Sequence, residues 1–144
     1  MQQEMLDGAL RRGGMPDPRE MNPLQMAYIG DTVHDLYVRT ELIASGMGVG
    51  AMHRQAVRMV SASAQARMLA AIDGELTCEE ADIVRRGRNA HPKHAAPKHA
   101  DPADYAHATG LEALWGYLYV TGQTQRLNAL MLTALERTEE TWHR

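Results

Sequence analysis

Residues 22–39 read NPLQMAYIGDTVHDLYVR, and this stretch decides the fold that we expect. Asn22 can cap free backbone N–H groups, Pro23 suits the first helical position, and Gln25 stands where a capping-box partner belongs. A helix is therefore predicted over residues 23–44. Because its residues are apolar on most sides, we expect it to be a central, buried helix.

Glycine and proline divide the rest of the chain into further helical blocks, and almost no stretch shows the alternation of a half-buried strand. Ser61 is a candidate internal cap, Thr77 and Glu80 form a capping box, and Gly87 is the expected stop of the helix that follows. The fold class is therefore all-α. The further helices are expected over residues 50–72 with a break at Ser61, 77–87, 102–121 and 123–140. We interpret residues 1–21 as a flexible arm and residues 22–144 as one domain.

Composition limits the classes of protein to consider. With 144 residues, 44% of them hydrophobic, the chain can bury one core. Its single cysteine excludes an internal disulfide. The chain also lacks the CxxC spacing of a zinc module, so we expect a cytoplasmic protein. No run approaches the roughly 18 apolar residues of a membrane span. The net charge of −3 predicts that any contact with nucleic acid is local.

Two acids lie in apolar surroundings. Asp31 occupies the middle of the first helix, and Glu112 lies in ATGLEALWGYLY, where Gly110 and Gly116 allow another backbone to come close. Two buried acids on packed helices share a proton or bind a cation, and oxygen ligands suit Mg²⁺ or Mn²⁺. Asp35 shares a helix face with Asp31. The spacing alone leaves open that these acids are hydrogen-bonded or ion-paired structural residues.

Several motifs resemble those of the ribonuclease III family. Residues 22–39 resemble its signature helix, and residues 108–119 resemble its second acidic motif. VSASAQA at 60–66, RRGRNA at 85–90 and the chain length are similar specifically to Mini-ribonuclease III, the subgroup without a separate domain for binding double-stranded RNA. The likeness covers roughly residues 22–136.

The resemblance implies a dimeric helical endoribonuclease in which each subunit hydrolyses one strand of an RNA duplex. Asp31 and Glu112 would be the catalytic, metal-binding acids, with Mg²⁺ or Mn²⁺ as the cofactor. The substrate implied is the large-subunit (23S) ribosomal RNA precursor, and the resemblance leaves open whether a ribosomal protein presents it.

Broader family members carry acids where this chain has Ala27 and Thr109. The subgroup resembles this chain in lacking them. That loss prompts an alternative, a non-catalytic RNA-binding or ribosome-assembly module; a purely structural helical dimer is a third hypothesis.

Five of the 15 basic residues lie close together in the sequence. Arginine binds phosphate bidentately and exposed lysine acts as a mobile charge, so this segment is expected to hold double-stranded RNA by shape. The alternative is that the arginines complement a helix C-terminus. The expected RNA-binding residues are Arg85, Arg86, Arg88, Lys93 and Lys98.

Histidines offer a further candidate site. His91, His94 and His99 match no compact zinc motif, so we expect a loop and not a metal site. His34 lies one helical turn from Asp31, and we interpret it as a hydrogen-bonded helix histidine.

Overall fold

The computed structural model describes residues 15–90 and 101–142, and every regular element in them is a helix. The all-α prediction is therefore confirmed. None of the described helices is long and apolar enough to cross a membrane. The helices are α2 (Pro23–Ala44), α3 (Val49–Met59), α4 (Ala62–Ile72), α5 (Cys78–Asn89), α6 (Pro102–Val120) and α7 (Thr124–Trp142), with a 3₁₀ turn, η1 (Asp73–Glu75), before α5.

The predicted helix starts are confirmed by their hydrogen bonds. The backbone N–H of Asn22 donates to Gln25 Oε1 at 3.0 Å, and the Asn22 side chain caps the first turn of α2. The Ser61 hydroxyl oxygen accepts from the first turn of α4, and Thr77 and Glu80 form the capping box of α5. These bonds satisfy N–H groups that a helix start leaves free, so short sequence signals set the element boundaries.

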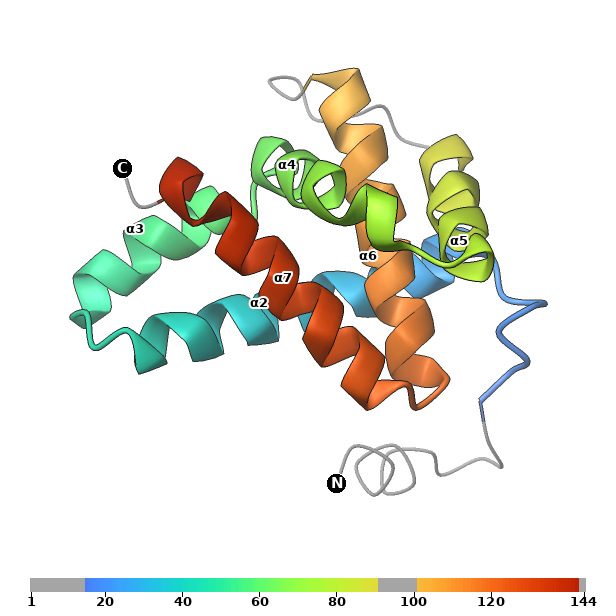
Figure 1. Ribbon diagram of the computed structural model, residues 1–144, viewed down its shortest axis with the longest axis horizontal. Coiled ribbons are helices and arrows are strands. Elements are labelled where there is room, and N and C mark those ends of the chain that lie inside the picture. Colours follow the sequence, from blue (N-terminus) through green and yellow to red (C-terminus); the bar gives the residue numbers. More distant parts are fainter. Residues whose placement is uncertain (1–14, 91–100, 143–144) are drawn as a thin grey trace.

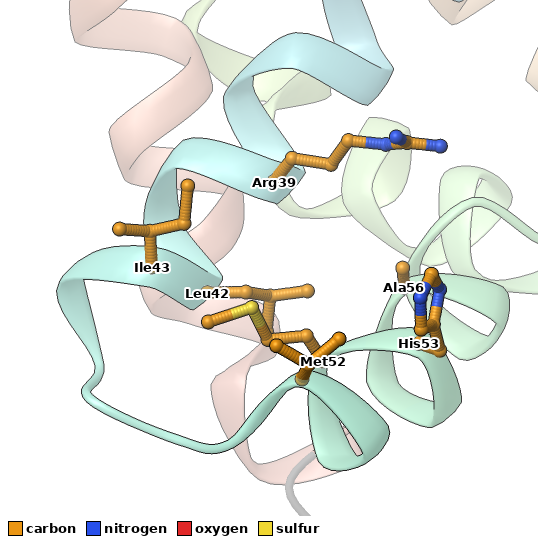
Figure 2. A pocket seen from close by; sticks show the side chains of 7 residues that line it. Arg39, Leu42, Ile43, Met52, His53 and Ala56 are labelled. Carbon is orange, nitrogen blue, oxygen red and sulfur yellow. The ribbon is translucent and has the colours of Figure 1, made fainter.

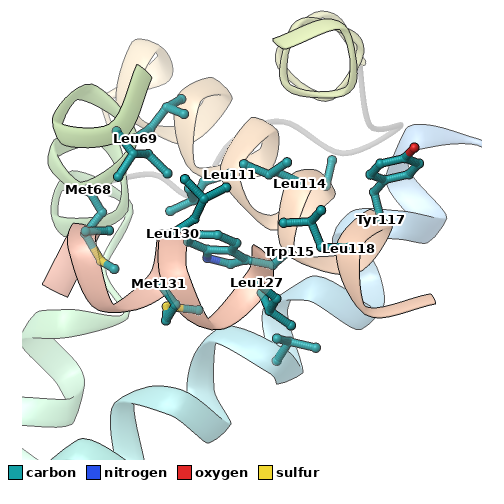
Figure 3. Close-up of a cluster of buried hydrophobic side chains, with 14 of the residues drawn as sticks. Met68, Leu69, Leu111, Leu114, Trp115, Tyr117, Leu118, Leu127, Leu130 and Met131 are labelled. Atoms are coloured by element: carbon teal, nitrogen blue, oxygen red, sulfur yellow. The ribbon is translucent and has the colours of Figure 1, made fainter. Parts of the chain in front are cut away.

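Helix α6 runs through the middle of the molecule and packs against α2, α4, α5 and α7 (Figure 1). Its Trp115 is fully buried. Figure 3 shows the apolar side chains that α4, α6 and α7 contribute to the core. Helix α7 buries one apolar stripe, namely Leu127, Leu130, Met131, Ala134 and Leu135.

The expectation that Gly87 ends a helix is wrong. Helix α5 continues to Asn89, and Gly87 lies buried inside it. A Cβ atom on Gly87 would lie 2.9 Å from the Cα atom of Gly110. Gly87 therefore allows α5 and α6 to approach closely, a use of glycine that looks the same in sequence as a helix stop.

The expectation that α2 is buried on most sides is also wrong for the single chain. Tyr28 is 79% exposed, Leu36 60% and Ile43 67%, although Met26 and Val38 on the opposite side are fully buried. Helix α2 therefore carries one face into the core and leaves an apolar face uncovered by the described residues.

Candidate active site

The site is built where α2 crosses α6. A Cβ atom on Gly30 would lie 1.7 Å from the carbonyl oxygen of Glu112, and one on Gly116 would lie 1.9 Å from that of Met26. Only glycine permits backbones to touch in this way. Asp31 follows Gly30 directly, so this crossing places its carboxyl group beside that of Glu112. The prediction that the two acids share a site agrees with this placement.

The surroundings of Glu112 disfavour its charged form. Burial, followed by the hydrogen bond and the negative charge of Asp31, raises the pKa of Glu112 to about 9, and a hydrogen bond from Gln65 acts in the opposite direction. Two carboxyl groups this close share a proton or need a cation. At neutral pH and without a cation, the Glu112 carboxyl is therefore protonated.

Asp31 differs from the sequence expectation, since it is exposed and not buried. The α6 backbone covers the Gly30 side of α2, and no described element packs over the next residue. The pair therefore combines one accessible acid with one mostly buried acid, which leaves the site open to solvent on one side.

Asp35 lies on the same helix face as Asp31, but it has a different partner. Its Oδ2 lies 3.0 Å from Arg39 Nε, in an ion pair one helical turn along α2. Asp35 is therefore neutralised within its own helix.

His34 is a structural residue, as predicted. Its ring is fully buried, with Nε2 3.0 Å from the Met59 carbonyl oxygen, while Trp115 Nε1 donates to Nδ1 at 3.2 Å. Because Nδ1 accepts, Nε2 carries the proton and the ring is neutral. Burial holds the pKa of His34 below its usual value. The ring joins α2 to α6 and to the end of α3.

Gln65 is the site residue that sequence reasoning missed. It lies on α4, is only 3% exposed, and forms a hydrogen bond with Glu112. Its Nε2 also donates to the Val60 carbonyl oxygen at 3.1 Å. The only signal in the sequence was a polar residue between Ala64 and Ala66 in a short capped helix. The hydrophobic pattern of this helix does not show which of its faces is buried.

The donor set fits a hard divalent cation. Asp31 and Glu112 offer carboxylate oxygens, and such ligands suit Mg²⁺ or Mn²⁺. Within the described ranges, no three His, Cys, Asp or Glu side chains gather to hold a metal. Ala27 is a buried alanine, and the Thr109 hydroxyl donates to the Tyr105 carbonyl oxygen at 3.0 Å. Two protein carboxylates, with water and substrate oxygens, would therefore make up the coordination shell.

The expected RNA-binding residues are not brought together at this pair. Arg85 forms an ion pair with Asp82, and Arg86 Nη2 donates to the Met21 carbonyl oxygen at 3.1 Å. Arg88 is exposed, and its side chain lies against Gly110. Gly110 and Glu112 are two residues apart and therefore point about 200° away from each other around α6, so Arg88 lies on another side of α6 from the acid pair. Lys93, Lys98 and the histidines 91, 94 and 99 lie outside the described residues.

Comparisons with known proteins agree with this architecture. The family model for the ribonuclease III domain matches residues 24–123. Mini-ribonuclease 3 of Symbiobacterium thermophilum is 46% identical over 123 residues, covering 85% of this chain and 94% of its own. Mini-ribonuclease 3 of Enterococcus faecalis is 39% identical over 130 residues, covering 88% and 98%.

A solved structure is similar in fold. The crystal structure of protein FN1578 from Fusobacterium nucleatum superposes with a TM-score of 0.77 at 21% identity, covering 84% of this chain and 99% of that one. From the family model, the curated relatives and the shared helical fold, the chain belongs to the ribonuclease III family and is an endoribonuclease.

Proposed function

We propose that this endoribonuclease cleaves double-stranded RNA with Mg²⁺, or Mn²⁺ in its place, held by Asp31 and Glu112. The observation that carries the proposal is the carboxyl pair at the α2–α6 crossing, where burial and Asp31 raise the pKa of Glu112. Two acids forced together bind a cation more readily than either does alone.

The residues of the pair have different tasks in this proposal. Asp31 is exposed and can face the RNA backbone, whereas the backbone of Glu112 is fixed by the helix crossing. When bound, a divalent cation lowers the pKa of a coordinated water and neutralises charge on the phosphate. The protein fixes the two oxygen ligands and leaves one side open for the duplex.

We further propose that the substrate is a large-subunit ribosomal RNA precursor, processed in the cytoplasm. Arg88 and the lysines 93 and 98 would contact the phosphates, because Arg85 and Arg86 already have protein partners. Few phosphate contacts predict modest binding that weakens as the salt concentration rises, with a slope set by the small number of phosphates contacted.

A homodimer completes the proposal, since an RNA duplex has two strands related by a twofold axis. The uncovered apolar face of α2 continues onto α3, where a hollow of about 230 Å³ lies between the two helices (Figure 2). A second copy packed on this face would bury it, and light scattering should then give twice the chain's 16.0 kDa. The exposed large apolar side chains of α2 and α3 are Tyr28, Leu36, Ile43, Val49 and Val57, and of these Ile43 and Val49 line the hollow.

Cleavage of a labelled RNA duplex tests the proposal. Asp31→Asn should lower the Mg²⁺-dependent cleavage rate by more than about 100-fold, the upper end of what losing a supporting residue produces. Asp35→Asn is the matched control, because it makes the same change one turn away in an acid already paired with Arg39. Its rate should stay within a few-fold of wild type, and circular dichroism should show helical folding in both variants.

The alternative function is a non-catalytic RNA-binding or ribosome-assembly module. It is prompted by Ala27 and Thr109, which stand where broader members of the family carry acids. It would be favoured if the wild-type protein bound the duplex and gave no products with Mg²⁺ or Mn²⁺. Cleavage that persists unchanged in Asp31→Asn would contradict the proposed metal site itself.

A further inference from the structure

Gln65 combines deep burial with an incomplete set of hydrogen bonds. Its side chain is 3% exposed, and Nε2 donates to the Val60 carbonyl oxygen and contacts the Glu112 carboxyl. Its Oε1 is buried and has no hydrogen-bond partner within the described part of the chain. A buried carbonyl oxygen without a partner is unfavourable for folding, so its presence calls for an explanation.

The orientation of the amide is fixed by its neighbours. Val60 offers a backbone carbonyl oxygen, and Glu112 offers a carboxyl group. Turning the amide over would place Oε1 against the carbonyl oxygen in place of a donor, with a loss of that hydrogen bond. The N–H groups therefore face Val60 and Glu112, and the oxygen is the atom left unpaired.

The anchor of this amide is rigid. Val60 lies at the end of α3, and Ser61 caps α4, so the bond from Gln65 to Val60 spans the junction of the two helices. The same junction is tied to α2 by the contact between His34 and the Met59 carbonyl oxygen. Gln65 thus connects Glu112, on α6, to a fixed point outside α6.

We propose that Gln65 is a positioning residue of the active site, whose amide N–H groups hold the Glu112 carboxylate in the orientation that binds the divalent cation. This inference rests on the proposed function, because it gives Gln65 a task only if Glu112 is a metal ligand. The unpaired Oε1 is then the consequence of aiming the N–H groups at Glu112. Positioning groups of this kind change metal affinity by about 10–100-fold when they are removed.

The test uses two substitutions of matched length. Gln65→Met removes the N–H donors together with the unpaired oxygen, and Gln65→Glu keeps an oxygen but removes the donors. Affinity for Mn²⁺ would be measured from the electron paramagnetic resonance signal of the free ion, and melting temperature without metal would be measured in parallel. Gln123→Met is the control, because Gln123 is an exposed glutamine whose amide donates to Thr121 at the α6–α7 turn.

We expect both Gln65 variants to bind Mn²⁺ at least about 10-fold more weakly than wild type. The metal-free melting temperature of Gln65→Met should fall modestly, because the Val60 carbonyl oxygen loses its donor. A loss of Mn²⁺ affinity measured well below that melting temperature is the result that a purely structural role of Gln65 would not produce. The control should bind Mn²⁺ like wild type.

Three results would overturn the inference. Wild-type affinity in Gln65→Met would show that Glu112 needs no positioning. Retained affinity in Gln65→Glu, with affinity lost in Gln65→Met, would show that the N–H donors are not required and that a carboxylate at this position can itself bind the cation. If the wild-type protein bound no Mn²⁺, the proposed metal site would fail and this inference with it, whereas the first two results leave that site intact.

Discussion

Glu80 and Glu112 are two glutamates that this fold treats in opposite ways. Glu80 is 4% exposed and receives two hydrogen bonds from Arg126, at 2.8 and 2.9 Å. Arg126 holds the pKa of Glu80 below its usual value. Glu112 faces Asp31, and its pKa rises to about 9.

The difference lies in the partner each acid meets. A buried carboxylate must be paired or lose its charge. Glu80 is neutralised by the Arg126 guanidinium within the fold and needs no further partner. The Glu112 region pairs an acid with an acid, so it is stabilised by a proton or by a cation from solution. A glutamate that is neutralised within the fold and one that needs a proton or a cation from solution are thus distinguished by their neighbours and not by their depth.

The largest expected effect comes from breaking the crossing that creates the Glu112 site. Gly30→Ala would drive a Cβ atom into the α6 backbone, and we expect a loss of at least about 3 kcal/mol in the free energy of unfolding. Denaturant titration measures this loss. Gly74→Ala is the control, since nothing lies within 4 Å of a Cβ atom there. Equal stability of the two variants would mean that the helices do not cross as closely as described.

A smaller effect is expected from removing Arg126, the cationic partner of Glu80. Arg126→Met should destabilise the protein by about 2 kcal/mol, less than for a fully buried pair because a third of the Arg126 side chain is exposed. The pKa of Glu80 should then rise, so that Glu80 resembles Glu112. Urea titrations at pH 5 and 8 measure both changes. An unaltered stability would show that solvent replaces the arginine.

The pH dependence of stability sharpens the comparison further. Between its ordinary value of 4.5 and about 9, Glu112 keeps its proton in the folded protein but not in the unfolded chain. Without metal, wild type should therefore lose stability relative to Glu112→Gln as pH rises through this window. The contribution of Glu80 runs the other way and is lost as pH falls below about 4.5. Thermal unfolding in a chelator at several pH values measures the difference. Parallel curves for the two proteins would contradict the raised pKa of Glu112 that burial and Asp31 cause.

Much of this fold follows from local sequence signals. Asn22, Ser61 and Thr77 cap their helices because side-chain oxygens near free N–H groups act over one turn. Gly87 was misjudged because the close approach of α5 to α6 depends on a residue far away in sequence. The apolar face of α2 was misjudged because hydrophobic pattern cannot say whether a second chain covers it.

The two acids of the candidate site could be predicted from the sequence, but the residue that contacts Glu112 could not. Asp31 and Glu112 stand out as charges among apolar neighbours, and family resemblance pairs them. Gln65 does not stand out, because its role depends on three helices meeting at one point. The exposure of Asp31 also depends on tertiary packing, since the same helix buries Gly30 directly beside it.

The most direct test of the central claim is the change in melting temperature when Mg²⁺ or Mn²⁺ is added to wild type and to Glu112→Gln. A ligand that binds only the folded protein stabilises it, by about 2.7 kcal/mol at 100 times its dissociation constant. We predict that metal raises the melting temperature of wild type and leaves that of Glu112→Gln unchanged, although the variant melts higher than wild type without metal. Equal metal-induced shifts in the two proteins would contradict the assignment of Asp31 and Glu112 as a metal site.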